Sequence, residues 1–567
     1  MESKNPNQKN AMEITSPSIN CLHEKATLTS PRGLLVALLS AAIACSIPAA
    51  HAATVTWNGG GGDNLWTNLD NWGGTAPVAS DPLVFDGTTR LTPSNNFAAN
   101  TQFNGITFAA GAGAFTLSGN AINLGGNIVD NAATNQFAST LPLTLLQNTD
   151  IAVNFSSATS LTFGAISGTG FALTKSGSGI LILASTGSYT GGTTVNAGTL
   201  RSTPDSTNNV FGSGAISIAS GATLQFRATG TNTVVTSNVI SGAGVVSIIG
   251  QAATAVQVLS GANTYNGTTT VGSGVLNIRN DTALGSTAGG TAVVAGAALQ
   301  LQNNITVGAE TLGLYGTGIS NDGALRNISG NNTYGGLVTL GSAARINSDA
   351  GTLTLSNNGT ITGATFGLTV GGAGNTTINS IIGTTTGTLT KDGAGTLTLT
   401  GANTYTGVTT VSAGTMLVSG TLANTTGVTV SGGALELGAA DRINNAATLT
   451  LSGGTFNVGG FSETLGTLTL TTSTASSLDF VSGGSILLFS GITTGNGTLA
   501  ISNWTSGSDS LRFTSNTNLL ASSFTVNGGA ATILNQGTYF EVVPEPATWA
   551  LLAFSLTTIM VLRRRRA

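Results

Sequence analysis

Cysteine, histidine and charge are scarce in this sequence. Its 567 residues include two cysteines and two histidines, and only 7% are charged. Both cysteines and both histidines lie before residue 53, at Cys21, His23, Cys45 and His51. From residue 53 onward the chain therefore cannot form a disulfide, a cysteine nucleophile, a Ser-His-Asp triad or a His/Cys zinc site.

The few charges also limit the class of partner. Between residues 53 and 543, 10 Lys and Arg stand against 18 Asp and Glu, which leaves a net charge of −8. Nucleic-acid binding requires a clustered basic surface, so we expect no nucleic-acid partner. The chain is not a disordered type either, because 40% of its residues are hydrophobic and its mean hydropathy is +0.27. Its 80 glycines, interspersed with Thr, Val, Ile and Leu, indicate short strands and many turns.

The N-terminus has the pattern of an export signal. A polar stretch precedes the apolar run "GLLVALLSAAIACSI", and the small residues Ala50 and Ala52 follow it in an A-x-A cleavage pattern. A membrane anchor is the alternative, but this run is short for a bilayer span. We expect residues 1–52 to be a signal peptide with one helix, removed by signal peptidase so that the mature chain begins at Ala53.

The middle of the chain is repetitive. The segment "GSGILILASTGSYTGGTTVNAGTL" at 177–200 and the segment "GAGTLTLTGANTYTGVTTVSAGTM" at 393–416 are identical at 13 of 24 positions. Four equivalent tyrosines are spaced by 76, 69 and 71 residues: Tyr189, Tyr265, Tyr334 and Tyr405. The repeat copies lie near 173–200, 258–276, 329–346 and 389–418. A period near 70 residues indicates a stacked repeat architecture.

Within each repeat, Thr alternates with Leu or Val, as in "TLTLT" at 396–400. This alternation places aliphatic side chains on one face of a strand and hydroxyls on the other. A β-sandwich would need a core of larger residues, whereas only 5% of the chain is aromatic. We therefore predict an all-β fold, a parallel β-helix with Gly- and Thr-rich coils of roughly 20 to 25 residues, about three coils to a repeat.

This prediction divides the chain into five parts. After the signal peptide at 1–52, we expect an N-terminal cap and the first coils at 53–160. The repeat-bearing solenoid follows at 161–440 and further coils at 441–541. The last part, 542–567, contains a short hydrophobic helix.

The best-preserved copies share the pattern L-T-K-x-G-x-G-x-L-x-L…Y-x-G-x-T-T-V-x-A-G-T-L, from Leu173 to Leu200 and nearly intact from Leu389 to Met416. This pattern resembles the autotransporter-associated β-strand repeat. The resemblance implies a passenger-like right-handed β-helix of an exported protein.

The first mature residues differ from the repeats. Three tryptophans and four acids crowd into some thirty residues: Trp57, Trp66, Trp72, Asp63, Asp70, Asp81 and Asp86. A structural cap on the first coil, a sugar-binding site and a calcium site are all compatible with this composition. We favour the cap.

Catalysis by a β-helix would require clustered acids on one face. Asp281, Asp349 and Asp392 would meet this requirement only if the coil phase aligned them, and Lys175 and Lys391 occupy equivalent repeat positions that indicate a structural role. We predict no catalytic, cofactor-binding or metal site, and no enzyme. The alternative is a β-helix that binds or degrades a polysaccharide.

The C-terminal end has three parts in order. Pro544, Glu545 and Pro546 precede a largely apolar stretch at 547–562, and four arginines follow: Arg563, Arg564, Arg565 and Arg566. As a helix the apolar stretch spans about 24 Å, short of the ~30 Å hydrocarbon core, and the arginines would hold its end in the cytoplasm.

This order resembles the PEP-CTERM sorting signal. The resemblance implies recognition of Pro544, Glu545 and Pro546 by an exosortase-type processing enzyme of a Gram-negative bacterium, after transient association with the inner membrane through 547–562. We therefore expect an exported structural or adhesive β-solenoid at the cell surface or in the extracellular matrix, with envelope or extracellular polysaccharide as a possible partner.

Overall fold

The computed structural model describes residues 54–204, 209–471, 475–481 and 483–545. The expected signal peptide with Ala50, Ala52 and Ala53, and the tail from Pro546 through the apolar stretch to Arg566, lie outside the described residues. Both expected terminal helices are therefore outside them as well. Within the described ranges, no helix has the length and hydrophobicity needed to cross a bilayer.

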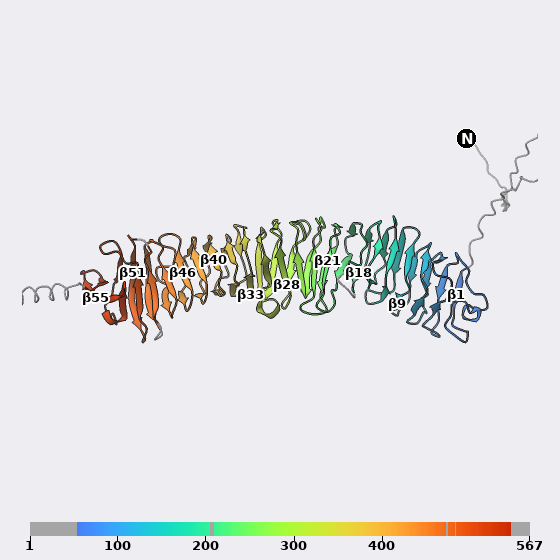
Figure 1. Ribbon diagram of the computed structural model, residues 1–567, viewed down its shortest axis with the longest axis horizontal. Coiled ribbons are helices and arrows are strands. Elements are labelled where there is room, and N and C mark those ends of the chain that lie inside the picture. Colours follow the sequence, from blue (N-terminus) through green and yellow to red (C-terminus); the bar gives the residue numbers. More distant parts are fainter. Residues whose placement is uncertain (1–53, 205–208, 472–474, 482, 546–567) are drawn as a thin grey trace, which may run out of the picture. The chain divides into compact units, whose positions relative to one another are not determined.

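The described chain is a parallel β-helix, as the sequence predicts. Successive coils are stacked in chain order from β1 to β55 (Figure 1). One face is a parallel sheet of nine strands. Its strands are β1 (Val55–Trp57), β2 (Leu83–Phe85), β5 (Ile106–Phe108), β8 (Ile128–Asp130), β11 (Thr149–Val153), β14 (Leu173–Ser176), β17 (Thr193–Val195), β19 (Ile216–Ile218) and β22 (Ile240–Gly242).

The same coils contribute strands to other faces. A five-stranded sheet consists of β4 (Thr101–Phe103), β7 (Ile122–Leu124), β10 (Leu143–Leu145), β13 (Ile166–Gly168) and β16 (Ser188–Tyr189). Another face continues through β12 (Ser160–Phe163), β15 (Ile180–Leu183), β18 (Thr199–Ser202) and β20 (Thr223–Phe226). Each early coil thus has three short strands.

The alternation of Thr with Leu determines which side chains form the core. In the four-residue strand β40 (Thr396–Leu399), the two leucines are buried and the two threonines half-buried. The same holds for the Thr-Leu-Thr-Leu strands β34 (Thr352–Leu355) and β47 (Thr448–Leu451). Because period-2 side chains point to opposite faces, each coil adds its aliphatic side chains to one continuous interior.

Paired strands of successive coils form columns along the stack. The position of these columns on the coil shifts at β33 (Val338–Ser348). This 11-residue strand pairs through its first residues with β30 (Leu312–Gly316), and through its later residues with β31 (Leu325–Ser329) and β36 (Leu368–Gly371). From β36 onward, one column runs through β39 (Leu389–Lys391), β42 (Thr409–Val411), β45 (Gly427–Val430), β47, β49 (Glu463–Leu470) and β51 (Ile486–Thr494).

Antiparallel strands close the C-terminal end. β56 (Phe540–Pro544) pairs antiparallel with β53 (Ser510–Phe513) and with β55 (Gly529–Asn535). Val542 of β56 is fully buried. Because an exposed parallel edge is a template for association, this hairpin protects the last coils.

Candidate functional site

The repeated tyrosines are part of the core. All four are 1% exposed or less. In three copies the hydroxyl shares a hydrogen bond with the threonine four residues later, at 2.7 Å for Tyr189–Thr193, 2.6 Å for Tyr265–Thr269 and 2.7 Å for Tyr405–Thr409. In the fourth copy this position is Val338, and the Tyr334 hydroxyl has no hydrogen-bond partner. Burial raises the pKa of each of these tyrosines well above its usual range.

The asparagine two residues before the tyrosine also has a structural role. Asn263, Asn332 and Asn403 are buried, and each side-chain oxygen accepts a hydrogen bond from a backbone N–H of the preceding coil, at 2.8 to 2.9 Å. These contacts join successive coils.

The two repeat lysines are buried and also join successive coils. Lys175 Nζ donates to the carbonyls of Ser176, Gly177 and Ala197 at 2.6 to 3.2 Å. Lys391 Nζ donates to the carbonyls of Asp392, Gly393 and Ala413 at 2.7 to 3.1 Å. Burial lowers the pKa of Lys175 to about 8. Each lysine thus ties a glycine-rich corner to the next coil.

The tryptophans of the opening segment pack against one another. Trp57 and Trp66 are fully buried and Trp72 is 5% exposed. Trp57 and Trp72 form an edge-on pair with ring centroids 5.2 Å apart, and Trp72 Nε1 donates to the Trp66 carbonyl at 2.8 Å. No ring face is left for stacking on a sugar, and the arrangement is that of a structural cap.

The acids near these tryptophans serve local turns. Asp63 accepts from the Leu65 N–H and the Asn68 amide, and Asp81 accepts from the Val78 N–H. The Leu65 hydrogen bond, followed by the one from Asn68, lowers the pKa of Asp63. In the described ranges, no three His, Cys, Asp or Glu side chains gather as a metal ion would require.

Two of the three aspartates that the sequence singled out belong to one polar network. Asp349 pairs with Arg326 of β31 at 2.8 Å, and Asp392 forms a two-pronged pair with Arg345 of β33 at 2.7 and 2.8 Å. Asn347 links the pairs, accepting from Arg345 at 3.2 Å and donating to Asp349 at 2.7 Å. Asp281 is not part of this network, and it accepts a hydrogen bond from the Thr306 N–H. The network can bind and orient a polar ligand, but its carboxylates are engaged by arginines.

The Arg345–Asp392 pair spans two coils, and a glycine leaves room for it. Asp392 is two coils beyond Arg345, and Gly371 lies between them in the stack. A Cβ on Gly371 would overlap both the Arg345 guanidinium and the Asp392 carboxylate. Gly371 is therefore required for the arginine to cross the intervening coil.

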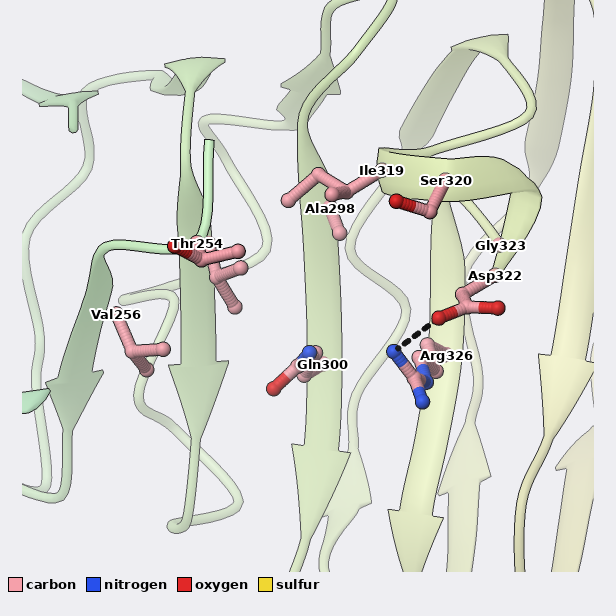
Figure 2. Close-up of a pocket in the computed structure, with 10 residues that line it drawn as sticks. Thr254, Val256, Ala298, Gln300, Ile319, Ser320, Asp322, Gly323 and Arg326 are labelled. Carbon is pink, nitrogen blue, oxygen red and sulfur yellow. Dashed lines mark hydrogen bonds and ion pairs between the residues drawn. The ribbon is translucent and has the colours of Figure 1, made fainter. Parts of the chain in front are cut away.

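A shallow groove lies beside this network, with a volume of about 210 Å³. Figure 2 shows Ile319 and Ser320 on the segment above it, Gln300 on the strand below, and Asp322 paired with Arg326 at one side. The overhanging segment adds length to its coil, because 26 residues separate the paired residues Leu299 and Leu325, against 21 between Leu325 and Ile346. Ser320 has a φ of 53°, a conformation unfavourable for a non-glycine residue.

The sequence analysis missed several buried carboxyl groups, among them Asp130, Glu310 and Glu463. Burial raises the pKa of Asp130 and Glu310 to about 6 and that of Glu463 to about 7. Glu463 accepts from the N–H groups of Arg442 and Ile443 at 2.7 and 3.3 Å. Each acid occupies an inward position of the Thr/aliphatic alternation, which is a signal that the sequence contains.

The expected sorting motif begins inside the folded cap. Pro544 is the last residue of β56, opposite Ala531 of β55. The Glu545 N–H donates to the Ala530 carbonyl at 2.9 Å. Pro546 lies beyond the described residues. The first two motif residues thus complete the antiparallel hairpin at the C-terminal end.

Comparisons with known proteins concern the repeats. A model of the passenger-associated-transport-repeat family matches residues 173–201, 254–278, 348–366 and 389–418, together less than half of the chain. The third segment begins just after the copy that the sequence analysis placed near 329–346. No solved structure matches the chain. Over 81 residues, 14% of this chain, the sequence is 46% identical to "Adhesin BmaC autotransporter" of Brucella suis biovar 1 (strain 1330), and the match spans only 2% of that protein. In its repeats, this β-helix is therefore similar to passenger-associated transport repeats, and over 81 residues the chain is similar to part of an adhesin autotransporter.

Proposed function

We propose that this protein is an exported β-solenoid, displayed at the surface or in the extracellular matrix of a Gram-negative bacterium, with a structural or adhesive role. The observation that carries the proposal is that the residues of the repeat signature support the fold. The tyrosine, asparagine and lysine side chains bind neighbouring groups within the solenoid. A sequence that repeats its structural residues builds length and surface, and the partial similarity to an adhesin agrees with this role.

The proposed role is not enzymatic. Asp349 and Asp392, the acids on the polar network, each pair with an arginine at 2.8 Å or less. Each carboxylate is engaged by its arginine and is therefore not free to approach a substrate as a general acid. Turnover of a polysaccharide by the purified protein would contradict this part of the proposal.

Delivery depends on both ends of the chain. We propose cleavage by signal peptidase between Ala52 and Ala53, and recognition of Pro544, Glu545 and Pro546 by an exosortase-type enzyme. Residues 547–562 would hold the chain transiently in the inner membrane, with Arg563–Arg566 in the cytoplasm. In support, the solenoid is closed by β56 immediately before the motif ends, so removal of the following residues would leave the cap complete.

Mass spectrometry of the protein from its native host tests this delivery route. We expect the wild-type chain to begin at Ala53 and to lack residues 547–567, and the Glu545→Ala variant to retain them. The control is Glu436→Ala, which removes a carboxylate from β46 (Ala434–Leu437), far from the motif in sequence. A wild-type chain that keeps its tail would refute the sorting proposal.

Display is tested separately on intact cells. Antibodies against the solenoid should label cells or matrix of the wild type, and deletion of the gene should reduce attachment of the cells to a surface or to one another. Labelling that appears only after the cells are permeabilised would contradict surface display.

A further inference from the structure

One outward position is threonine in seven successive coils. The pairing register of the column from β36 to β51 aligns Thr369, Thr390, Thr410, Thr429, Thr450, Thr469 and Thr493. We call these residues the threonine row. In the first six strands the side chains before and after the threonine are buried, and so is Ile492 before Thr493. The buried core therefore fixes the orientation of the row.

The threonine row is regular. Neighbouring strands lie about 4.8 Å apart, so the seven side chains form a line on the order of 29 Å long. A β-branched residue in a strand has few χ1 rotamers, which keeps the hydroxyl and methyl groups in similar orientations from coil to coil. The result is a preorganised, periodic surface.

The hydroxyls of the row have no protein partner. Within the described residues, none of the seven takes part in a side-chain hydrogen bond, whereas Thr339 and Thr362 pair at 3.2 Å and Thr409 pairs with Tyr405. Each hydroxyl in the row can therefore donate one hydrogen bond to a ligand and accept others.

Apart from Arg345, which is in register with Thr369, and its ion-pair partner Asp392, the surroundings of the row are uncharged. Hydroxyl side chains flank it two residues away in several coils: Thr388, Ser412, Ser431, Thr448, Ser452, Thr467 and Thr471. Asp392 beside Thr390 is paired with Arg345, and the Lys391 and Glu463 side chains of the same column are buried. A charged polymer would find no complementary charge along the row, whereas a neutral hydroxylated chain would not have to shed strongly bound counterions.

We propose that the threonine row binds a linear, uncharged, β-1,4-linked glycan that lies along the stacking direction of the coils. Such a chain is an extended ribbon whose rings recur at nearly the spacing of β-strands, so successive rings can meet successive threonines. The hydroxyl exchanges hydrogen bonds with ring hydroxyls and the methyl group packs against ring C–H groups. This inference gives the proposed adhesive role a ligand class, and it rests on that role.

The number of threonines that the glycan contacts, rather than any single contact, determines the affinity. No aromatic side chain lies in the row, so each threonine contributes little and the contacts add along the chain. Binding should therefore strengthen with glycan length and should change little with salt concentration. Glycans with α-linkages adopt a helical shape, so their rings cannot stay aligned with more than a few threonines of the row.

Isothermal titration calorimetry of the purified full-length protein tests the proposal. The probes are oligomers of β-1,4-linked glucose and of β-1,4-linked N-acetylglucosamine, each compared as dimer, tetramer and hexamer, with an α-1,4-linked glucose hexamer for comparison. We expect at least one β-linked series to bind, with hexamer affinity roughly tenfold or more above dimer affinity.

Two variants assign the binding to the row. The double variant Thr410→Val/Thr450→Val keeps the β-branched shape and removes two hydroxyls, and it should lower hexamer affinity roughly tenfold. Thr410→Ser should retain most of the affinity. Thr107→Val is the matched control, because Thr107 is likewise the outward residue at the centre of a strand, β5, but is paired with valines, Val84 and Val129, in the neighbouring coils. Circular dichroism verifies that each variant is folded.

The proposal is wrong if neither β-linked series binds, if affinity does not depend on length, or if Thr107→Val weakens binding as much as the double variant. Equal binding of the α-linked hexamer would also overturn it. Failure of surface display would be seen on cells and leaves the calorimetry unchanged, so the outcomes for the proposed function and for this ligand class can be told apart.

Discussion

At the scale of single residues, a buried tyrosine needs a partner for its hydroxyl. An unpaired polar group in the interior costs roughly 1–3 kcal/mol, so the Tyr–Thr pair explains why the motif specifies threonine four residues after tyrosine. Tyr334 is followed by Val338 at that position, and its buried hydroxyl has no hydrogen-bond partner.

This difference predicts opposite responses to one substitution. Tyr189→Phe should lower the free energy of unfolding by about 1 kcal/mol, because it leaves the buried Thr193 hydroxyl without its hydrogen-bond partner. Tyr334→Phe should be neutral or stabilising, because it removes an unpaired hydroxyl. Urea denaturation of both variants measures the difference. Equal destabilisation would show that the hydrogen bond does not matter.

The buried acids make stability depend on pH. Burial raises the pKa of Glu463 to about 7, so the folded protein holds a proton that the unfolded chain loses above its ordinary pKa of 4.5. Stability from this group is fully present below pH 4.5 and is lost as the pH rises through 7.

We therefore expect the protein to be more stable at pH 5 than at pH 8, by a few kcal/mol at most when Asp130 and Glu310 are included. Glu463→Gln keeps an oxygen acceptor for the Arg442 N–H and should flatten part of this dependence. Denaturation midpoints across this pH range measure the effect. A variant with the same pH slope as wild type would mean that Glu463 does not titrate there.

At the scale of strands, Gly371 in β36 determines whether β33 and β39 are joined by an ion pair. Gly371→Ala should push apart Arg345 and Asp392, at a cost of roughly 1–3 kcal/mol. Hydrogen exchange should show faster opening of β36 and β39. Gly272→Ala is the control, because its Cβ would have only ordinary contacts, at 3.5 Å and beyond. Similar exchange in the two variants would contradict this role of Gly371.

At the scale of the whole molecule, each coil contacts mainly the coils before and after it. Such a stack has stability that is approximately a sum over coils and their interfaces. Its response to damage should therefore be local and should not unfold the entire chain.

Leu397→Ala tests this expectation. Leu397 of β40 is fully buried, and its truncation should cost about 2–5 kcal/mol. Hydrogen exchange should accelerate in the neighbouring strands β37 (Asn375–Ile378) and β43 (Thr415–Val418), while protection within residues 54–160 stays unchanged. Loss of protection throughout the chain would indicate a single cooperative unit.

The alternation of Thr with Leu and the 70-residue period were sufficient to predict the fold class and the approximate coil length. A structural role of Lys175 and Lys391 was also predicted from their equivalent repeat positions, whereas their burial was not. The partners of the repeat tyrosines did not follow, because the buried Thr193, Thr269 and Thr409 differ in sequence from outward threonines only by their distance from a tyrosine. Asp281, Asp349 and Asp392 looked alike in sequence, yet only two belong to one network.

The sequence by itself determined which residues point inward, because the side-chain period of a strand is two and the aliphatic residues follow it. Only the tertiary structure decided which outward residues become neighbours. Successive paired residues along the column from Leu389 are 19 to 24 residues apart, and a shift of one residue would turn a threonine from the surface to the core. The threonine row and the Arg345–Asp392 pair depend on this register, which the packing of whole coils fixes.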